Sequence, residues 1–300
     1  MSVLEVRNVT KKFGPFTALD GINLQVNQGE IYGFIGPNGA GKSTTIRILL
    51  GILKATAGEA KIFGLDAWKD AVEIHKRIAY VPGDVNLWPN LTGGEVIDLL
   101  MRLRGNGDPK KREAFIEKFE LDPSKKCRTY SKGNRQKVAL IAAFSTDADL
   151  YILDEPTSGL DPLMERHFQE TVLEVKEAGK SVLLSSHILS EVEKLCDTVG
   201  IIRQGKMIEA GPLDELRHLT RTSLLVKTKK PVTDIAEVQG VHEVAESAEG
   251  LSFQVDSETL DDVMRHIAPY GIIKLESTPP TLEDLFMRHY EGTEKVGGGS

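Results

Sequence analysis

A glycine-rich run of eight residues near position 40 has the composition and spacing of a nucleotide phosphate loop. It fits the pattern Gly-x-x-x-x-Gly-Lys-Ser over Gly36, Pro37, Asn38, Gly39, Ala40, Gly41, Lys42 and Ser43. The glycines let backbone N–H groups turn toward phosphate oxygens, which a Cβ would obstruct. Lys42 supplies a positive charge for the outer phosphates, and the Ser43 hydroxyl can ligate Mg²⁺. We therefore expect ATP and Mg²⁺ to bind here, with Thr44 as a further contact and Lys42 also acting in catalysis.

The competing interpretation of this run is a glycine turn that happens to precede a lysine. The residues on either side favour the phosphate loop, because an apolar, β-rich run precedes it at 31–35 and a helical pattern follows at 42–50. A strand before the loop and a helix after it are the structural context that the motif requires. The start of that helix adds its positive end to the predicted phosphate site.

Two adjacent carboxylates end another apolar run. Residues 150–153 are Leu-Tyr-Ile-Leu, and Asp154 and Glu155 follow them. Asp154 can hold Mg²⁺ opposite Ser43, usually through water. Glu155 then lies beyond the strand, where a carboxylate can polarise an attacking water. On its own this pattern is weak, because many strands end in solvated acids; beside a complete phosphate loop it predicts a catalytic pair.

A histidine and an aspartate complete the set of candidate groups. His187 follows the apolar run 182–185, and Asp161 begins a helical pattern after a turn-rich segment. Parallel strands deliver their carboxyl ends to one edge of the sheet, so Lys42, Glu155 and His187 are expected to converge there. Without this context, His187 would be interpreted as a structural histidine and Asp161 as a helix cap.

The elements that must position these groups predict an α/β fold with a parallel sheet. The predicted strands and helices alternate; the strands are 31–35, 151–153, 182–185 and 199–202, and the helices are 42–50, 135–144, 164–178 and 189–196. Apolar and polar residues alternate over 3–28, which predicts antiparallel strands. The amphipathic pattern of residues about 84–145 predicts a helical insertion. We assign residues 1–218 to this domain. Residues 219–292 predict a small α+β domain, with strands at 224–226, 251–255 and 272–275 and a helix at 257–268.

Composition narrows the possible classes of function. The chain has 300 residues, 40% of them apolar, and a net charge of −7. Residues 221–300 hold 8 basic and 14 acidic side chains, so no basic surface for nucleic acid is expected. No apolar run approaches the roughly 18 residues of a membrane span, and the first residues do not resemble a signal peptide, so we expect a cytoplasmic location. Residues 296–300 look like an added linker.

These motifs together resemble the ATP-binding subunit of an ABC transporter. The resemblance covers residues 3 to about 218, with the phosphate loop as Walker A, residues 150–155 as Walker B and its glutamate, and His187 as the switch histidine. It places Asp161 near nucleotide in the D-loop, which comprises residues 158–161. It also assigns Phe13 to stack on adenine; the alternative is that Phe13 is an edge-strand or core residue.

The family's signature segment has a variant form here. Residues 130–134 read Tyr-Ser-Lys-Gly-Asn, where the family usually has Leu-Ser-Gly-Gly-Gln. The resemblance implies that Ser131, Gly133 and Asn134 contact nucleotide. Lys132 could aid that binding or face solvent.

The glutamine of the family's Q-loop is absent. After Tyr-Val-Pro at 80–82 the chain continues Gly83-Asp84. Gly83 cannot contact Mg²⁺ or water through a side chain, so we name Asp84 as a candidate ligand reaching the metal through water. The Gly-Asp variant, the variant signature and residues 278–286 resemble the drug-exporting branch of the family.

The resemblance implies a function and its partners. Two cassettes, expected to be identical, meet head to tail with ATP between Lys42 of one and Ser131 of the other. A separate transmembrane permease receives the motion, with residues 84–104 as its expected contact, and the chain lies on the cytoplasmic face of the membrane. The implied activity is ATP hydrolysis that drives export of a drug, antibiotic or lipid-like compound. An importer ATPase and a non-transport ABC ATPase are the alternatives.

Overall fold

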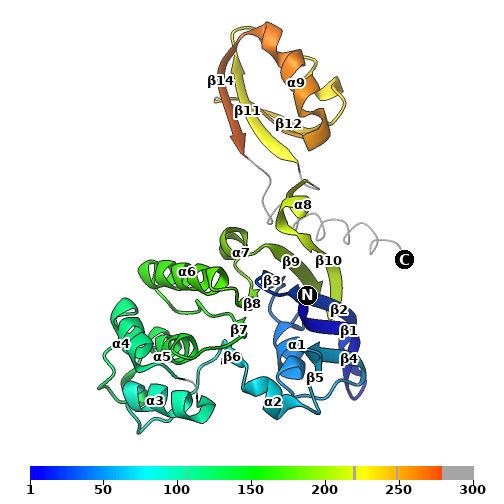
Figure 1. Cartoon of the computed structure of the whole chain (residues 1–300). Coiled ribbons are helices and arrows are strands. Elements are labelled where there is room, and N and C mark those ends of the chain that lie inside the picture. The colour runs from blue at the N-terminus through cyan, green and yellow to red at the C-terminus, as the bar shows by residue number, and fades with distance from the viewer. Residues whose placement is uncertain (106, 219–220, 248, 279–300) are drawn as a thin grey trace. The chain divides into compact units, whose positions relative to one another are not determined.

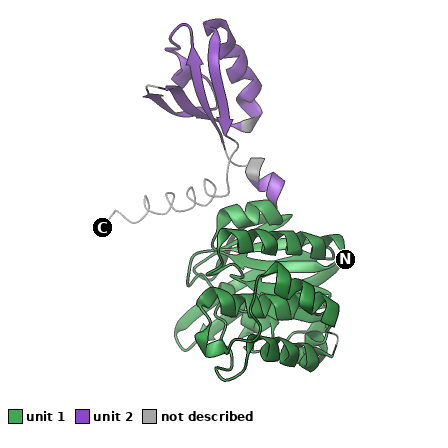
Figure 2. Cartoon of the chain, turned by 90° about the vertical axis from the view of Figure 1, so that its left-hand side faces the viewer, with its two compact units in different colours: residues 1–211 green, residues 212–300 purple. Residues whose placement is uncertain are grey.

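The computed structural model describes residues 1–105, 107–218, 221–247 and 249–278. The chain forms two compact units, Met1–Gly211 and Pro212–Ser300 (Figure 2). The predicted linker at 296–300 and most of the segment 278–286 lie outside the described residues. The domain limits expected from the sequence stay predictions.

A six-stranded sheet forms the centre of the first unit (Figure 1). Its order is β10-β9-β3-β8-β7-β6, and neighbouring strands from β9 to β6 run parallel. Strands β3 and β7 are buried along their whole length, as expected of strands covered on both faces. The strands are β3 (Ile31–Ile35), β6 (Ile78–Val81), β7 (Leu150–Asp154), β8 (Ser181–Ser186), β9 (Thr198–Arg203) and β10 (Lys206–Pro212).

An antiparallel sheet of order β2-β1-β4-β5 covers the helix that follows β3. Helix α1 (Lys42–Leu49) contacts β2 and β4 of this sheet and β7 of the parallel sheet. One apolar cluster therefore joins both sheets through residues such as Leu4, Ile46 and Ile152. The sheet's strands are β1 (Ser2–Phe13), β2 (Phe16–Asn27), β4 (Ala57–Ile62) and β5 (Leu65–Asp66), and the short helix α2 (Ala71–His75) follows them.

Helices replace strands between β6 and β7, as the sequence predicted. Helix α3 (Gly93–Arg104) begins with a capping box, in which the Glu95 N–H donates to Thr92 Oγ1 and the Thr92 N–H donates to the Glu95 carboxylate. Helix α4 (Pro109–Lys118) begins at an Asp108 cap. Helix α5 (Lys132–Phe144) is buried from Gln136 onward and contacts α3, α4 and β6. No helix among the described residues is long and apolar enough to cross a membrane.

Two further helices follow the carboxyl ends of β7 and β8. Helix α6 (Pro162–Glu177) packs on β8, and α7 (Leu189–Leu195) packs on β3 and β8. Together with the parallel sheet, the antiparallel sheet and the helical insertion, they confirm the predicted fold class.

The second unit is a four-stranded antiparallel sheet with helices. Its order is β12-β13-β11-β14, and an apolar cluster that includes Leu224, Phe253 and Val263 lies between the sheet and α9. The sequence missed β12, because its residues are mostly exposed at the sheet edge and show no apolar alternation. The elements are α8 (Leu213–His218), β11 (Thr222–Thr228), β12 (Val241–Ser247), β13 (Gly250–Val255), α9 (Leu260–Ile267) and β14 (Ile272–Thr278).

The buried cluster of this unit makes a stability prediction. Phe253 is 2% exposed, so Phe253→Ala should lower the free energy of opening of the second unit by about 3–5 kcal/mol. Hydrogen exchange at the amides of β11 and β13 measures this. Ile273→Ala, at a side chain 59% exposed, is the control and should change it by less than about 0.5 kcal/mol. Equal losses of protection in the two variants would contradict this core.

Candidate active site

The predicted phosphate loop connects β3 to α1. A Cβ at Gly36 would lie 2.3 Å from the carbonyl oxygen of Ile202, so β9 leaves no room for a side chain there. Gly39 and Gly41 have φ angles of 80° and 119°, which side-chain-bearing residues rarely adopt. No side chain caps the N-terminus of α1, so its first N–H groups are open to a phosphate. The backbone conformation thus provides the cradle that the glycine spacing predicted.

Lys42 is buried within this loop, with 5% of its surface exposed. Its Nζ donates to the carbonyl oxygen of Gly36 and, at 3.3 Å, to that of Pro37. The same ammonium lies 3.4 Å from Glu155 Oε1. A buried positive charge held by the loop itself is well placed to meet phosphate oxygens.

Asp154 ends β7 beside the loop and is 5% exposed. Burial raises the pKa of its carboxyl, although the hydroxyls of Ser185 and Ser43 lie close enough to lower the pKa in part. Its Oδ1 is nevertheless buried without a hydrogen bond of good geometry. A buried oxygen without a partner, next to the Ser43 hydroxyl, fits a Mg²⁺ ligand.

The metal would need other ligands as well. Among the described residues, no group of three or more His, Cys, Asp or Glu side chains could hold a metal ion. One carboxylate and one hydroxyl leave the other positions to phosphate oxygens and water, which is how Mg²⁺ binds with nucleotides.

Glu155 lies between Lys42 and His187. Its backbone has φ 46°, a left-handed conformation that is uncommon for a glutamate, and its N–H donates to the Ser185 carbonyl at 2.8 Å. Its Oε2 lies 3.2 Å from His187 Nδ1, and the His187 side chain is 48% exposed. The carboxyl ends of β3, β7 and β8 therefore bring Lys42, Asp154, Glu155 and His187 together, in the arrangement that the sequence suggested.

The signature segment packs on the D-loop of its own chain. Ser131 caps α5 by accepting from the Asn134 N–H at 3.2 Å. A Cβ at Gly133 would lie 2.3 Å from the Gly159 carbonyl oxygen, and Lys132 Nζ donates to Ser158 Oγ at 2.5 Å. The described hydrogen bonds do not join this segment to the phosphate loop of the same chain.

Three predicted residues stand apart from this cluster. Asp161 caps α6 by accepting from the N–H groups of Leu163 and Met164, and these bonds lower the pKa of its carboxyl. Phe13 is half-exposed at the end of β1, with Lys11 Nζ 4.9 Å from its ring centre. Asp84 is exposed and accepts only a long hydrogen bond, from Asn86 at 3.4 Å. The described contacts join none of the three to Lys42 or Asp154.

Two buried polar residues near the site were missed. Gln136 on α5 donates to the Pro82 carbonyl at 3.4 Å, next to Gly83, where a Cβ would lie 3.1 Å from the Asp154 carbonyl oxygen. Glu191 on α7 is 4% exposed. Charged or amide residues on a helix are expected at the solvent face, so the pattern gave no signal for either.

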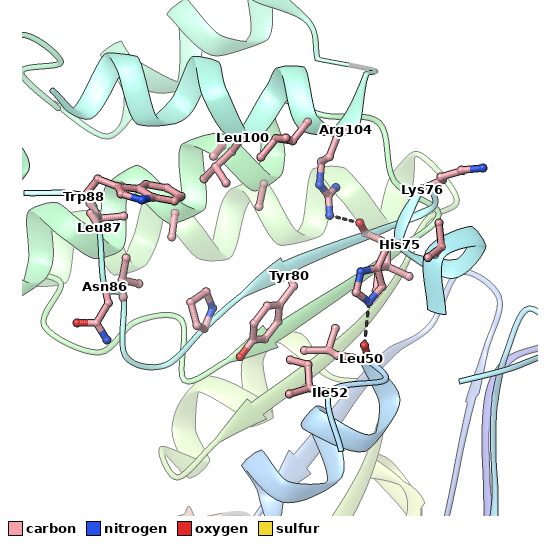
Figure 3. A pocket seen from close by; sticks show the side chains of 18 residues that line it. Leu50, Ile52, His75, Lys76, Tyr80, Asn86, Leu87, Trp88, Leu100 and Arg104 are labelled. Carbon is pink, nitrogen blue, oxygen red and sulfur yellow. Dashed lines mark hydrogen bonds between the residues drawn. The ribbon is translucent and has the colours of Figure 1, made fainter. Parts of the chain in front are cut away.

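An apolar groove of about 680 Å³ lies beside the site, where β6 faces α3 and α5 (Figure 3). Trp88 and Leu100 lie on one side of it and Tyr80 on the other (Figure 3). Burial, reinforced by the nearby Asp154 charge, raises the pKa of Tyr80 to about 12. The groove therefore shares Tyr80 with the surroundings of the candidate metal ligand. Its apolar lining includes Leu50, Ile52, Val72, Ile78, Leu87, Trp88, Leu100 and Leu103.

Comparison with known proteins matches both units. The sequence profile of the ABC transporter family matches residues 19–158, and that of the C-terminal domain of DrrA1-3-like ATP-binding proteins matches residues 211–290. An uncharacterized ABC transporter ATP-binding protein, YhaQ of Bacillus subtilis, is 33% identical over 98% of this chain and 99% of its own length. The bacitracin transport ATP-binding protein BcrA of Bacillus licheniformis is 32% identical over 100% of this chain and 99% of its own length. The linearmycin resistance ATP-binding protein LnrL of Bacillus subtilis is 32% identical over 95% of this chain and 97% of its own length.

Solved structures of ATP-binding cassettes match about seven tenths of the chain. An ATP-binding subunit of an ABC transporter is 33% identical, with a TM-score of 0.67 over 72% of this chain and 92% of the other. A dimeric ATP-binding cassette in a post-hydrolysis state, bound to ADP and phosphate, is 25% identical, with a TM-score of 0.65 over 70% of this chain and 98% of the other. Fold and site define a phosphate-loop ATPase of the ATP-binding cassette class. The chain belongs to the ABC transporter family, in which its similarity is to the ATP-binding proteins, and the resemblance read from the motifs is confirmed.

The burial of Asp154 makes a pH-dependent prediction. Because its pKa is raised on folding, ionisation of this carboxyl costs stability as the pH rises through the raised pKa. Asp154→Asn should therefore raise the unfolding temperature of the nucleotide-free and Mg²⁺-free chain at about pH 8. The gain should shrink as the pH falls through the raised pKa, because the native carboxyl then becomes neutral as well. Thermal unfolding followed by circular dichroism at several pH values measures this.

Asp161→Asn is the matched control for this prediction. Backbone hydrogen bonds lower the pKa of Asp161, so the same change should give no gain in stability at about pH 8. An Asp154→Asn chain no more stable than the unsubstituted chain at that pH would contradict the interpretation.

Proposed function

We propose that this chain hydrolyses ATP to power export of a drug, antibiotic or lipid-like compound through a separate transmembrane subunit. The observation that carries the proposal is similarity along both units to proteins named for bacitracin transport and linearmycin resistance. The match of residues 211–290 to the DrrA1-3-like C-terminal domain supports the same branch. We also propose that the chain lies at the cytoplasmic face of the membrane, where its ATP is available.

The proposed catalytic roles follow from the distances at the sheet edge. ATP supplies the γ-phosphoryl group, and Mg²⁺ neutralises charge on its phosphates. Ser43 and Asp154 would hold the metal, and Lys42 the outer phosphates. Glu155 polarises the attacking water, since its carboxylate is fixed from both sides by Lys42 and His187. His187 keeps that carboxylate oriented and can meet the phosphate with its exposed ring.

The second half of each site would come from another cassette. No described hydrogen bond joins Ser131, Gly133 or Asn134 to the phosphate loop of their own chain, and we propose that they meet the nucleotide of a partner in a head-to-tail homodimer. The dimeric cassette bound to ADP and phosphate supports this arrangement. Phe13 would stack on adenine, and Asp161 would lie near the junction as a helix cap. Asp84 remains a proposed ligand through water only.

The groove beside β6 is the proposed contact for the transmembrane subunit. It includes part of the segment 84–104, and its apolar walls suit an amphipathic helix laid into the groove. Its Arg104 donates to the Ile78 carbonyl (Figure 3). Arg104 also donates to Thr146 Oγ1 at 3.0 Å, and it makes no ion pair with a described residue. A helix from the membrane partner that carries one carboxylate at that end would complement this cation.

Glu155→Gln tests the proposed function. The amide keeps the shape of the side chain but cannot accept the water's proton, so kcat should fall by about 10²–10⁴-fold while ATP binding is retained. Steady-state ATPase assays and equilibrium binding of ATP measure the two effects. Glu177→Gln, at an exposed glutamate that ends α6, is the control and should hydrolyse normally. Normal turnover by Glu155→Gln would remove Glu155 from this role.

Export is tested in the source cells. Cells lacking this chain should become more sensitive to at least one compound in a panel that includes bacitracin. The unsubstituted gene should restore resistance and Glu155→Gln should not, because hydrolysis is lost. Unchanged sensitivity and unchanged accumulation across the panel would count against export.

The docking proposal makes a separate prediction. Leu103 lines the groove and is 73% exposed, so Leu103→Glu should sharply reduce the amount of chain retained on washed membranes of its own cells. Leu173→Glu places the same charge at an exposed leucine of α6 outside the groove and is the control. Equal retention of the two variants would contradict docking at this groove.

A further inference from the structure

A buried acid behind the candidate site has no role in the proposed chemistry. Glu191 lies on α7, four residues after His187, with 4% of its surface exposed. No described residue forms an ion pair with it. Burial of a carboxylate without a neighbouring cation costs free energy of folding. The presence of Glu191 at this position therefore needs an explanation.

The first set of contacts of Glu191 is with the segment that carries His187. Ser186 Oγ donates to Glu191 Oε2 at 2.7 Å, and the same hydroxyl accepts from the Ile188 N–H at 3.0 Å. These two bonds bracket His187 in the chain. They also fix the end of β8, where Ser186 pairs with Ile35, the residue before the phosphate loop.

The carboxyl of Glu191 also lies close to the segment that follows Glu155. Oε1 is buried without a hydrogen bond of good geometry, yet the buried Thr157 hydroxyl lies close enough to lower the pKa of the Glu191 carboxyl, which burial raises. Thr157 is two residues beyond Glu155. One side chain therefore lies next to both loops whose residues make the Glu155–His187 contact.

Helix α7 is a rigid base for this side chain. A Cβ at Gly33 of β3 would lie 2.6 Å from Val192 Cγ1 and 2.9 Å from Cys196 Sγ, so the helix is packed directly on the strand's backbone. Val192 follows Glu191 in the chain. The carboxylate is thus anchored to the sheet that also carries the phosphate loop.

We propose that Glu191 is a positioning residue for hydrolysis, which holds His187 against Glu155 through Ser186. The proposal rests on the roles given above to Glu155 and His187. In this role Glu191 contacts neither the nucleotide nor the attacking water. Its effect is on orientation, because a displacement of about 1 Å in a catalytic group can cost about 10²-fold in rate.

The test compares single substitutions in the full chain. Glu191→Ala should lower kcat by about 10–100-fold, with KM for ATP changed by less than about twofold. Glu191→Gln should restore most of the rate, since its amide oxygen still accepts the Ser186 hydroxyl. Ser186→Ala should lose kcat as Glu191→Ala does. Ser145→Ala, at a buried hydroxyl without a hydrogen bond at the end of α5, is the matched control and should keep the normal kcat.

A double-mutant cycle separates positioning from general destabilisation. In a His187→Ala background, Glu191→Ala or Ser186→Ala should lower kcat by no more than about a further twofold, because no imidazole remains to be oriented. Losses that multiply in the double variants, or a normal kcat in Ser186→Ala, would overturn the proposal. If Glu191→Ala does not fold, the Ser186–His187 cycle decides alone.

The same experiment distinguishes the two levels of proposal. Normal turnover by both Glu155→Gln and His187→Ala would mean that the proposed catalytic roles are wrong. Losses in these two variants combined with independent effects of Glu191 would leave those roles standing and remove Glu191 from the site.

Discussion

The contact of the Glu155 carboxylate with Lys42 on one side and His187 on the other is the interaction on which the site depends. Glu155 follows Lys42 by 113 positions and His187 follows Glu155 by 32, and the carboxyl edge of the parallel sheet brings the three together. The ammonium is buried, so its attraction for the carboxylate and for a phosphate is weakened little by water. Any displacement of β3, β7 or β8 would therefore change the chemistry before it changed the fold.

The two sheets explain how that contact stays fixed. Helix α1 lies between the antiparallel sheet and the parallel sheet, and one apolar cluster runs through all three. The glycines of the phosphate loop permit its turn, while close packing against Ile202 keeps the loop against β9. Around this rigid centre, the signature segment, the D-loop and the groove beside β6 are the surfaces that we propose contact other subunits.

Much of the fold and of the candidate site was predictable, because short stretches of sequence determine it. The phosphate loop, the apolar runs before Asp154 and His187, and the helical insertion have patterns that reflect burial and turn geometry. The edge strand β12 was missed because an exposed strand need not alternate. The hydrogen bond from Lys132 to Ser158 was not predicted. The sequence offered solvent and phosphate as the surroundings of the Lys132 ammonium, whereas the structure shows it bonded to the Ser158 hydroxyl. Glu191 gave no signal either, because a glutamate on a short helix is expected to be solvated.

The most direct measurement mixes two subunits that are inactive for different reasons. A Glu155→Gln chain lacks its own water-activating group, and a Ser131→Glu chain should repel the phosphate of its partner's nucleotide. In a head-to-tail dimer, one of the two sites in the mixed pair keeps both Glu155 and Ser131. The ATPase rate of the mixture should therefore rise well above that of either variant alone. A mixture that forms dimers and stays as inactive as its components would contradict a site shared between two subunits.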